Sequence, residues 1–206
     1  MYFKILQKIF EDFDKKYEVE IKPLPWNEAI NEVKNGSAFA VYPPYKVPSS
    51  RPWMDYSDPI LQETIAVFCQ DIEKKWPQQY SNAKVGMNFG FAFPPSIFKI
   101  FRENKMQVFA FDNNEIALKY LQLKKIDCYV NDRDAVIYSN NLLRLPPLKE
   151  ISTLAQENSY LGFSQKFSSK YKFKDDFIKN FNTHLQKIKE NGTLNSIVSD
   201  FLKKTE

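Results

Sequence analysis

The sequence predicts an α/β fold of two similar lobes, each built on a mostly parallel sheet flanked by helices. A helix-to-strand unit occurs twice, as AINEVKNGSAFAVY in the first half and as ALKYLQLKKIDCYV in the second. Helical and strand patterns alternate along most of the chain, which favours right-handed βαβ crossovers. With 206 residues, the chain is also long enough for two lobes that each bury a core.

The predicted lobes are discontinuous in the sequence. Residues 1–68 and 160–206 are expected to form the first lobe, and residues 69–159 the second. The chain would then cross twice between the lobes. Because open α/β sheets bind ligands beyond the carboxyl ends of their strands, we expect a ligand cleft between the lobes.

The chain begins with a helical pattern. Apolar residues at helical spacing predict an amphipathic helix over residues 3–16. Over residues 18–22 apolar and charged side chains alternate, which predicts a half-buried strand that ends at Pro23. Asn27 is the expected N-cap of the next helix, and Gly36 is its expected C′ residue.

Strands are predicted next at 38–42 and 65–69, and the second of them is a continuous apolar run, typical of a strand buried on both faces. The pattern then repeats with strands at 84–87, 107–111 and 126–130. Pro94 and Pro95 are expected to open the helix after the first of these, and Asp112 is expected to cap the next helix.

The last quarter of the chain is less regular. Residues 141–158 contain two prolines and little periodicity, so no element is predicted there. Residues 160–163 are expected to form a short strand that returns to the first lobe. Two amphipathic helices close the chain, and the first of them ends at Gly192.

Composition excludes several classes of protein. The net charge of +4 comes from 29 basic and 25 acidic side chains that are evenly mixed, which argues against nucleic-acid binding. No apolar run approaches the roughly 18 residues of a membrane helix, so no membrane insertion is expected. With 18 Phe, 11 Tyr and 3 Trp, some aromatic rings are expected to line a cavity, and the alternative is extra packing in two cores.

The two cysteines, Cys69 and Cys128, lie in separate apolar segments. They show no CxxC or Cys/His spacing, so we expect neither a metal site nor another cofactor. Two buried thiols are the expected state. A single long-range disulfide is the alternative, because geometry rather than sequence decides it.

Arg51 lies in a loop that follows the strand predicted at 38–42. Four prolines stiffen this loop, namely Pro43, Pro44, Pro48 and Pro52. Arg51 and its aromatic neighbours are therefore expected to be held in place, as a binding site for an anion requires. The alternative is an arginine that is solvated or ion-paired.

Four segments in order carry a family resemblance: WNEAINEVKNG, SSRPWMDYSDPI, KIDCYVNDRDAV and FIKNFNTHLQKIKENGTLNSIV. Together they resemble the bacterial extracellular solute-binding proteins of family 3, the amino-acid receptors of ABC importers. The resemblance implies a two-lobed, type II periplasmic-binding-protein fold that closes on its ligand by a hinge motion. It also implies a periplasmic, non-enzymatic receptor that delivers an amino acid or similar small zwitterion to an ABC-type permease.

Matched position by position, Arg51 resembles the family arginine that holds the ligand α-carboxylate, and Asp132 the aspartate that takes the α-ammonium. A guanidinium offers two parallel donors to a carboxylate, whereas an ammonium needs a compact anion. Trp26 falls where the family often places an aromatic ring against the ligand. Tyr45, in the proline-rich loop, and Phe91, beside Gly90, complete the expected ligand-binding residues.

Each assignment has a competitor. Asp127 and Asp134 compete with Asp132, and Trp26 is equally suited to a core. His184, the only histidine, is expected to be an exposed bystander, which leaves no histidine placed for catalysis.

The sequence departs from the family pattern in two places. Around Gly90 the family shows small hydroxyl residues, whereas this chain has Phe89, Phe91, Ala92 and Phe93, leaving backbone N–H groups near a helix start to hold a carboxylate. The ligand is then expected to be larger, more apolar or differently held. The family also begins with a strand ahead of the first helix, and Met1 stands almost at that helix. Either the chain is a fragment, or another segment or chain fills the gap, and a monomer is expected otherwise.

Two alternative functions follow. One is a dehydratase acting on cyclohexadienyl acids, in which Asp127, Asp132, Asp134 or Glu157 supplies the acid. The other is a degenerate interaction protein that keeps the fold and binds no amino acid.

Overall fold

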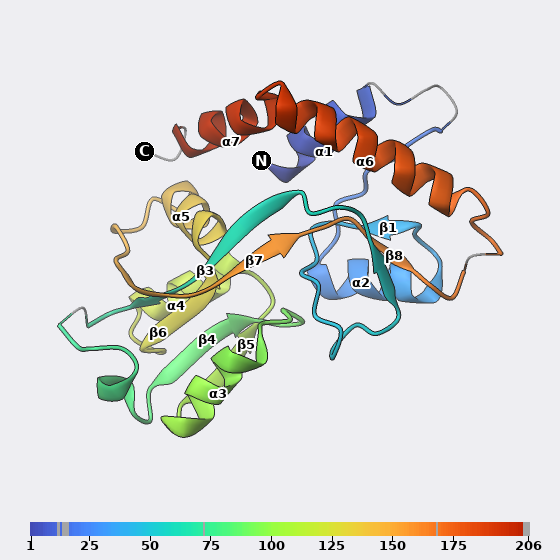
Figure 1. Ribbon diagram of the computed structural model, residues 1–206. Helices are drawn as coiled ribbons and strands as arrows, with labels where there is room; N and C mark the ends of the chain where they lie inside the picture. Colours follow the sequence, from blue (N-terminus) through green and yellow to red (C-terminus); the bar gives the residue numbers. More distant parts are fainter. Residues whose placement is uncertain (12, 14–16, 72, 168, 204–206) are drawn as a thin grey trace. The chain divides into compact units, whose positions relative to one another are not determined.

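The computed structural model describes residues 1–11, 13, 17–71, 73–167 and 169–203 (Figure 1). The chain divides into two compact units. The first contains Met1–Leu61 and the chain from Asn158 onward, and the second contains Gln62–Glu157.

The first unit contains three short strands and four helices within the described residues. They are α1 (Tyr2–Glu11), α2 (Trp26–Asn35), β1 (Ala40–Val41), β2 (Met54–Tyr56), β8 (Gly162–Ser164), α6 (Lys174–Glu190) and α7 (Thr193–Lys203). The strand order is β1-β8-β2, and both pairs are antiparallel. The prediction of a mostly parallel sheet is therefore wrong for this unit, because the central strand β8 comes from the distant end of the chain and runs opposite to both β1 and β2.

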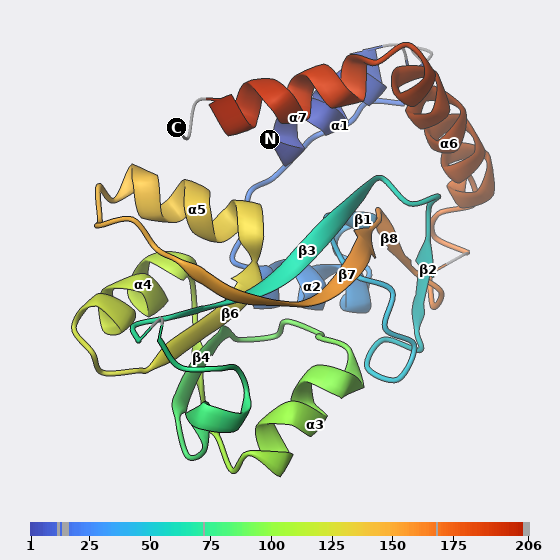
Figure 2. The ribbon, with the colours of Figure 1, turned by 60° about the vertical axis from the view of Figure 1, so that its left-hand side comes forward.

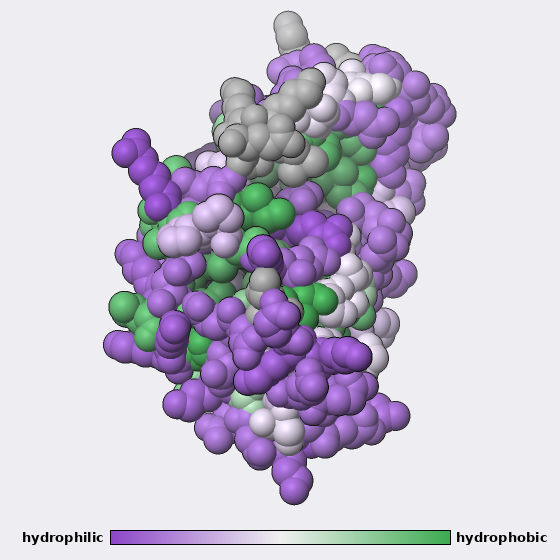
Figure 3. All heavy atoms as spheres, turned by 90° about the vertical axis from the view of Figure 1, so that its left-hand side faces the viewer, coloured by the Kyte–Doolittle hydropathy of each residue, from purple (hydrophilic) through white to green (hydrophobic). Residues whose placement is uncertain are grey.

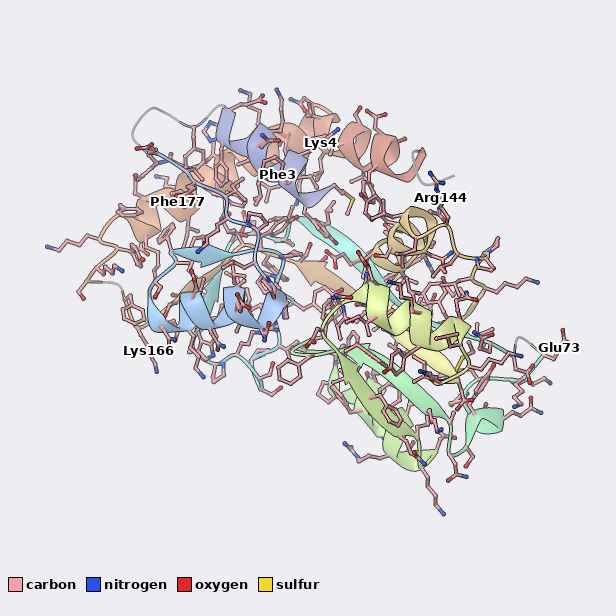
Figure 4. All side chains as sticks on the ribbon, turned by 180° about the vertical axis from the view of Figure 1, so that it is seen from behind. Phe3, Lys4, Glu73, Arg144, Lys166 and Phe177 are labelled. Carbon is pink, nitrogen blue, oxygen red and sulfur yellow. A yellow bond between two sulfur atoms is a disulfide. The ribbon has the colours of Figure 1, made fainter. Side chains whose placement is uncertain are left out.

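Helices α1 and α6 supply most of the core of this unit. Ile5 and Ile9, one helical turn apart on α1, are fully buried, as are Phe181 and Leu185 on α6. Figure 2 shows α1 beside α6 and α7, and Figure 4 marks Phe177 on α6. The helix predicted over residues 3–16 is confirmed as far as Glu11, and residues 12 and 14–16 lie outside the described residues.

Two details of the first unit differ from expectation. Residues 18–22 are extended but form no strand, and Val19 is 37% exposed. An alternating pattern becomes a strand only where a partner strand lies beside it, and none pairs with this segment among the described residues. Asn27 is not the N-cap of α2, because the helix begins one residue earlier and Pro25 occupies the cap. Gly36 does end the helix, with a left-handed φ of 74°.

The second unit is built on a five-stranded sheet. Its elements are β3 (Leu61–Cys69), the 3₁₀ turn η1 (Gln78–Tyr80), β4 (Lys84–Asn88), α3 (Pro95–Glu103), β5 (Gln107–Phe111), α4 (Asn114–Gln122), β6 (Cys128–Asp132), α5 (Arg133–Leu142) and β7 (Glu150–Ser159). The strand order is β5-β4-β6-β3-β7. Strand β4 runs parallel to β5 and β6, whereas β3 runs antiparallel to β6.

This sheet is mixed rather than mostly parallel, and the connections explain why. Helices α3 and α4 join the parallel strands, as crossovers require. Between β3 and β4, the short turn η1 is the only regular element among the described residues, and β4 runs opposite to β3. Strand β7 lies beside β3 at the other side of the sheet (Figures 1 and 2).

The prediction for this unit is correct in part. Strand β6 begins and ends two residues later than the predicted 126–130, and β3 begins four residues before the predicted 65–69. Strand β5 has the predicted bounds, and α3 begins at Pro95 as expected. The cap of α4 is Asn113, whose side chain accepts a hydrogen bond from the Ile116 N–H at 3.0 Å, and not Asp112. Helix α5 and strand β7 were not predicted, because their apolar residues follow no clear period.

One face of the sheet is sealed by α4 and α5. Leu118 and Leu121 of α4 and Val136 of α5 pack with Phe68 and Tyr129 of the sheet. Gly86 permits this packing, because a Cβ there would lie 2.6 Å from the Cδ1 atom of Ile126.

Cys69 and Cys128 form a disulfide, so the expectation of two buried thiols is wrong. The two residues face each other on β3 and β6, with their Cα atoms 4.1 Å apart. Strand register decides this pairing, and register depends on long-range contacts that the local sequence does not contain.

Replacing both Cys69 and Cys128 by alanine is expected to lower the free energy of unfolding by about 3 kcal/mol. The bond spans 59 residues, so its loss frees a long loop in the unfolded chain. Urea unfolding followed by circular dichroism measures the change. The unmodified chain with reducing agent should reproduce the double variant, and an unchanged midpoint in both would contradict the expectation.

Among the described residues, no helix combines the length and the apolar character needed to cross a bilayer. Figure 3 shows one face of the molecule, where hydrophilic residues predominate and hydrophobic residues gather in smaller areas between them.

Candidate functional site

Arg51 of the first unit is held by a tight turn. Its backbone N–H and that of Ser50 both donate to the carbonyl of Val47, each at 3.0 Å. The Arg51 carbonyl accepts a hydrogen bond from the N–H of Met54, the first residue of β2. The backbone on both sides of Arg51 is therefore fixed, as the prolines of this loop predicted.

The side chain of Arg51 is buried, with only 6% of its surface exposed. One Nη1 hydrogen bond reaches the carbonyl of Tyr45 at 3.3 Å, and the guanidinium carbon lies 5.4 Å from the centre of the Trp26 ring. Burial lowers the pKa of Arg51 from its usual value. The alternative of a solvated arginine is therefore wrong.

Trp26 packs in a core, which was one of the two roles expected for it, and its contact with a ligand stays a prediction. The half-buried ring at the start of α2 packs against the small core of Val33, Val41 and Met54. It also faces the Arg51 guanidinium, a contact that stabilises a buried cation. Tyr45 is different, because its ring is buried, at 3% exposed, and its backbone carbonyl is the group that meets Arg51.

Tyr56, on β2, lies in the same group of residues as Arg51 and Trp26, and it was not predicted from the sequence. Its hydroxyl is buried and has no hydrogen-bond partner among the described residues. Burial raises the pKa of Tyr56, and the charge of Arg51 acts in the opposite direction. The Lys46 Nζ lies 5.8 Å from the centre of its ring, so two cations border one tyrosine. Its position only five residues after Arg51 could have indicated this, because β2 follows directly on the loop that contains Arg51.

Asp132 of the second unit ends β6 and caps α5. Its Oδ1 accepts a hydrogen bond from the Ala135 N–H at 2.8 Å, and only 4% of the residue is exposed. Burial, and then the charge of Glu63, raise the pKa of Asp132 to about 7. Its competitors differ, because Asp127 is exposed and accepts from the Lys84 N–H, and Asp134 is only half-buried.

Glu63 is a second buried carboxyl group close to Asp132, with 7% of the residue exposed. Ile65 of β3 faces Asp132 of β6, and Glu63 lies two residues from Ile65, so it lies on the same face of the sheet. The buried strand predicted from the sequence began only at residue 65, so Glu63 lay outside it and was given no role. Its place within an apolar segment was the available signal, because a buried carboxyl group is unusual.

A hydrogen-bonded cluster lies at the carboxyl ends of β4 and β6. The Oδ1 of Asn114 accepts from Asn88, Tyr129 and Asn131, each at 2.8 Å. The Oδ1 of Asn88, at 2.7 Å, is the alternative acceptor for the single proton of the Tyr129 hydroxyl. The Asn131 Oδ1 accepts from the Asp132 N–H at 2.9 Å. The cluster therefore fixes the backbone where Asp132 begins the helix. Sequence reasoning missed it, because its members come from three separate elements.

Replacing Tyr129 by phenylalanine is expected to destabilise the protein by about 1–2 kcal/mol. The half-buried Asn88 and Asn114 and the buried Asn131 each lose a hydrogen-bond partner. Burial raises the pKa of Tyr129 far above its usual range, so the hydroxyl stays protonated and can donate. Thermal unfolding measures the loss. Tyr138→Phe, at a 40% exposed tyrosine of the same unit, is the matched control, and an equal effect in both variants would contradict this role.

The aromatic segment after β4 forms part of the second unit. Phe93 is buried, at 2% exposed, and lies against Phe91 with ring centres 5.5 Å apart. Phe91 itself is half-buried. Pro94 and Pro95 open α3, and neither has an N–H, so the first N–H groups at this helix start belong to Ser96 and Ile97.

His184 is no candidate for chemistry. Its Nδ1 lies 2.9 Å from the carbonyl of Asn180 in the preceding turn of α6, and its ring lies against Phe13. It is half-buried rather than exposed. Among the described residues, no three side chains of His, Cys, Asp or Glu are grouped as metal ligands.

The chain was compared with known protein families and structures. Residues 2–204 match the bacterial extracellular solute-binding proteins, family 3, and the chain belongs to that family. No curated protein sequence matches the chain. The resemblance described from the sequence is thereby confirmed.

Solved structures show the same periplasmic-binding-protein fold at low identity. An ancestral arginine-binding protein bound to arginine is 18% identical, with a TM-score of 0.80 over 97% of this chain and 86% of the other. A structure described for glutathione import via GshT and the cystine ABC importer TcyBC of Streptococcus mutans is 16% identical, with a TM-score of 0.81 over 98% and 84%. The ancestral amino acid-binding protein AncCDT-1, a precursor of cyclohexadienyl dehydratase, is also 16% identical, with a TM-score of 0.76 over 97% and 83%.

Proposed function

We propose that this protein is a receptor for an amino acid or a similar small zwitterion, without enzymatic activity of its own. The observation that carries the proposal is Arg51. In a member of this family, a buried guanidinium is held in a rigid loop, against the ring of Trp26. Burial makes a charged hydrogen bond to a ligand carboxylate stronger, because water competes less for the same donors.

The proposed roles follow from charge. Arg51 binds the ligand carboxylate, since its planar fork can donate two parallel hydrogen bonds. Asp132 binds the ammonium group, for which its second carboxylate oxygen is suited. Trp26 borders the ligand through its exposed edge, and Tyr45 contributes by holding Arg51 through its carbonyl. Phe91 is proposed as an apolar contact to the ligand side chain.

Two further proposals come from the family. The receptor delivers its ligand to an ABC-type import permease, and it works in the periplasm. The division into lobes of residues 1–68 with 160–206 and of residues 69–159, with closure by a hinge, also stands as a proposal. The solved relatives that bind arginine, or that serve glutathione and cystine import, support amino acids and short peptides as the first ligands to test.

A thermal-shift screen against the protein amino acids, cystine and glutathione tests the proposal, followed by calorimetry on each hit. A raised melting temperature with one-to-one binding is the expected result. Arg51→Ala should abolish the shift, and Lys99→Ala, on an exposed lysine of α3, should preserve it. Absence of any ligand, or a shift that is independent of Arg51, would reject the proposal.

One observation favours a second candidate, a dehydratase of cyclohexadienyl acids. The pKa of Asp132 is raised to about 7, so this carboxyl group retains a proton near neutral pH that it could give to a leaving hydroxyl. AncCDT-1 supports testing this activity, as an ancestor of such an enzyme. Incubation with prephenate should yield phenylpyruvate if it is present, and Asp132→Asn should abolish the yield.

A further inference from the structure

Strand β5 ends the sheet of the second unit on the side of β4 (Figure 1). The Gln107 N–H donates to the Ala83 carbonyl at 2.9 Å, and the Phe111 carbonyl accepts from the Phe89 N–H at 2.7 Å. In a parallel pair, every second residue of a strand hydrogen-bonds the neighbouring strand through its backbone. The backbone groups of Phe109, between Gln107 and Phe111, therefore also face β4. The N–H and C=O groups of the intervening residues then point away from the sheet.

Those intervening residues are Val108 and Ala110, and both are exposed. Strand β5 reads QVFAF, with no charge and no proline. Proteins usually protect an edge strand with a lysine, a proline or a bulge, because open backbone groups attract another strand. This edge carries none of these protections.

Exposed apolar side chains continue from this edge onto α4, which contacts β5. Val108 is 44% exposed and Phe109 is 40% exposed. On α4, Ile116 and Tyr120 are each 39% exposed, and Leu123, just beyond the helix, is 65% exposed. The last three recur at intervals of four and three residues, so they form one stripe along the helix. Strand edge and stripe together are called the β5 edge surface.

We propose that the β5 edge surface binds a second copy of this chain, with the two β5 strands paired antiparallel across a two-fold axis. Symmetry requires one residue to face its own counterpart. Placing Phe109 opposite Phe109 of the second copy sets Val108 opposite Ala110, so the outward N–H and C=O groups of both residues find partners. The two phenylalanines then form an aromatic cross-strand pair.

The charges that flank β5 favour a second copy over a foreign strand. Lys105 precedes the strand and Asp112 follows it, and both are exposed. In the antiparallel arrangement, Lys105 of each copy lies about one residue away from the position opposite Asp112 of the other copy. The two-fold axis gives two such pairs of opposite charge. A five-residue strand is too short to hold a dimer alone, so the apolar stripe of α4 must share in the interface. The resulting dimer replaces the monomer expected from the sequence.

Sedimentation equilibrium of the full chain tests the proposal, with Ala110→Pro as the decisive variant. Proline removes an N–H that points away from β4, so the sheet itself keeps all its hydrogen bonds. The unaltered chain is expected to form a reversible dimer. Ala110→Pro should raise the dissociation constant of the dimer at least about tenfold, because the hydrogen bond donated by the Ala110 N–H is lost in both copies. Ala110→Ser keeps the N–H and should leave it unchanged, and thermal unfolding should show both variants folded.

Charge reversal supplies a second arm that does not alter the backbone. Asp112→Lys should weaken the dimer, and the double variant Lys105→Asp with Asp112→Lys should restore it. Lys105 has a φ of 52°, a conformation that aspartate also tolerates. A chain that stays monomeric at submillimolar concentration overturns the proposal, whether or not another protein binds the surface. A dimer that Ala110→Pro leaves intact overturns it equally, and neither result depends on the proposed ligand.

Discussion

Replacing Arg51 by alanine is expected to weaken binding of the cognate ligand by about 30-fold to 1,000-fold. The variant removes a charged donor from a buried position, and the ligand carboxylate must then enter without a partner. Loss of one such desolvated, charge-assisted contact costs on the order of 2–4 kcal/mol. The effect should be large because Arg51 is only 6% exposed and water therefore cannot easily replace it.

Isothermal titration with the ligand found by the screen measures this loss. Arg51→Lys separates charge from geometry, because lysine keeps the charge and loses the planar fork. We expect it to recover only a small part of the affinity. Lys99→Ala is the control, since Lys99 is an exposed cation on α3.

An affinity that Arg51→Ala leaves unchanged would contradict the assignment. Thermal unfolding must accompany the titration, because Arg51 also hydrogen-bonds the Tyr45 carbonyl. A variant that unfolds at a much lower temperature would point to a structural role. Arg51→Met, which fills the same space without charge, then distinguishes lost packing from lost recognition.

Replacing Asp132 by asparagine is expected to stabilise the protein above pH 7 and to have little effect near pH 4. The folded pKa of Asp132 is about 7, above its usual value of 3.8, so the folded state binds the proton more tightly than the unfolded state does. Stability is therefore lost as the pH rises from about 4 to about 7. The shift of roughly 3 pKa units corresponds to about 4 kcal/mol at most. Asparagine removes this cost and is still able to cap α5.

Ligand affinity should respond to pH in the opposite direction. If Asp132 binds an ammonium group, it must be ionised, so affinity should fall below pH 7, approaching tenfold per pH unit. The charged groups around it are Glu63, Arg133 and Asp134. Glu63→Gln removes the nearby negative charge, and we expect it to move both pH midpoints downward.

Urea unfolding at pH 5 and pH 8, with calorimetry at the same values, measures both effects. Asp127→Asn is the control, because Asp127 is an exposed aspartate of the same unit. Equal stability changes in Asp132→Asn at the two pH values would contradict the raised pKa. Affinity independent of pH would contradict the role of Asp132 in binding.

Local patterns of the sequence determined the elements that depend on neighbouring residues. The apolar run in QVFAF, the prolines that open α3 and the left-handed Gly36 each act within a few residues, and each gave the observed structure. The four segments that carry the family resemblance are also local, and the family is confirmed. The sequence also predicted that Arg51 is held in place, because prolines and aromatic residues surround it in the chain itself.

Only the tertiary structure decided how distant segments pair. The antiparallel β3–β6 register joins Cys69 to Cys128 and places Glu63 on the same sheet face as Asp132. The directions of the short strands in the first unit and the asparagine cluster around Tyr129 have the same origin. The physical reason is common to all of them. Helix and turn signals are local, whereas register, burial and the pKa of a buried acid depend on residues far away in the sequence.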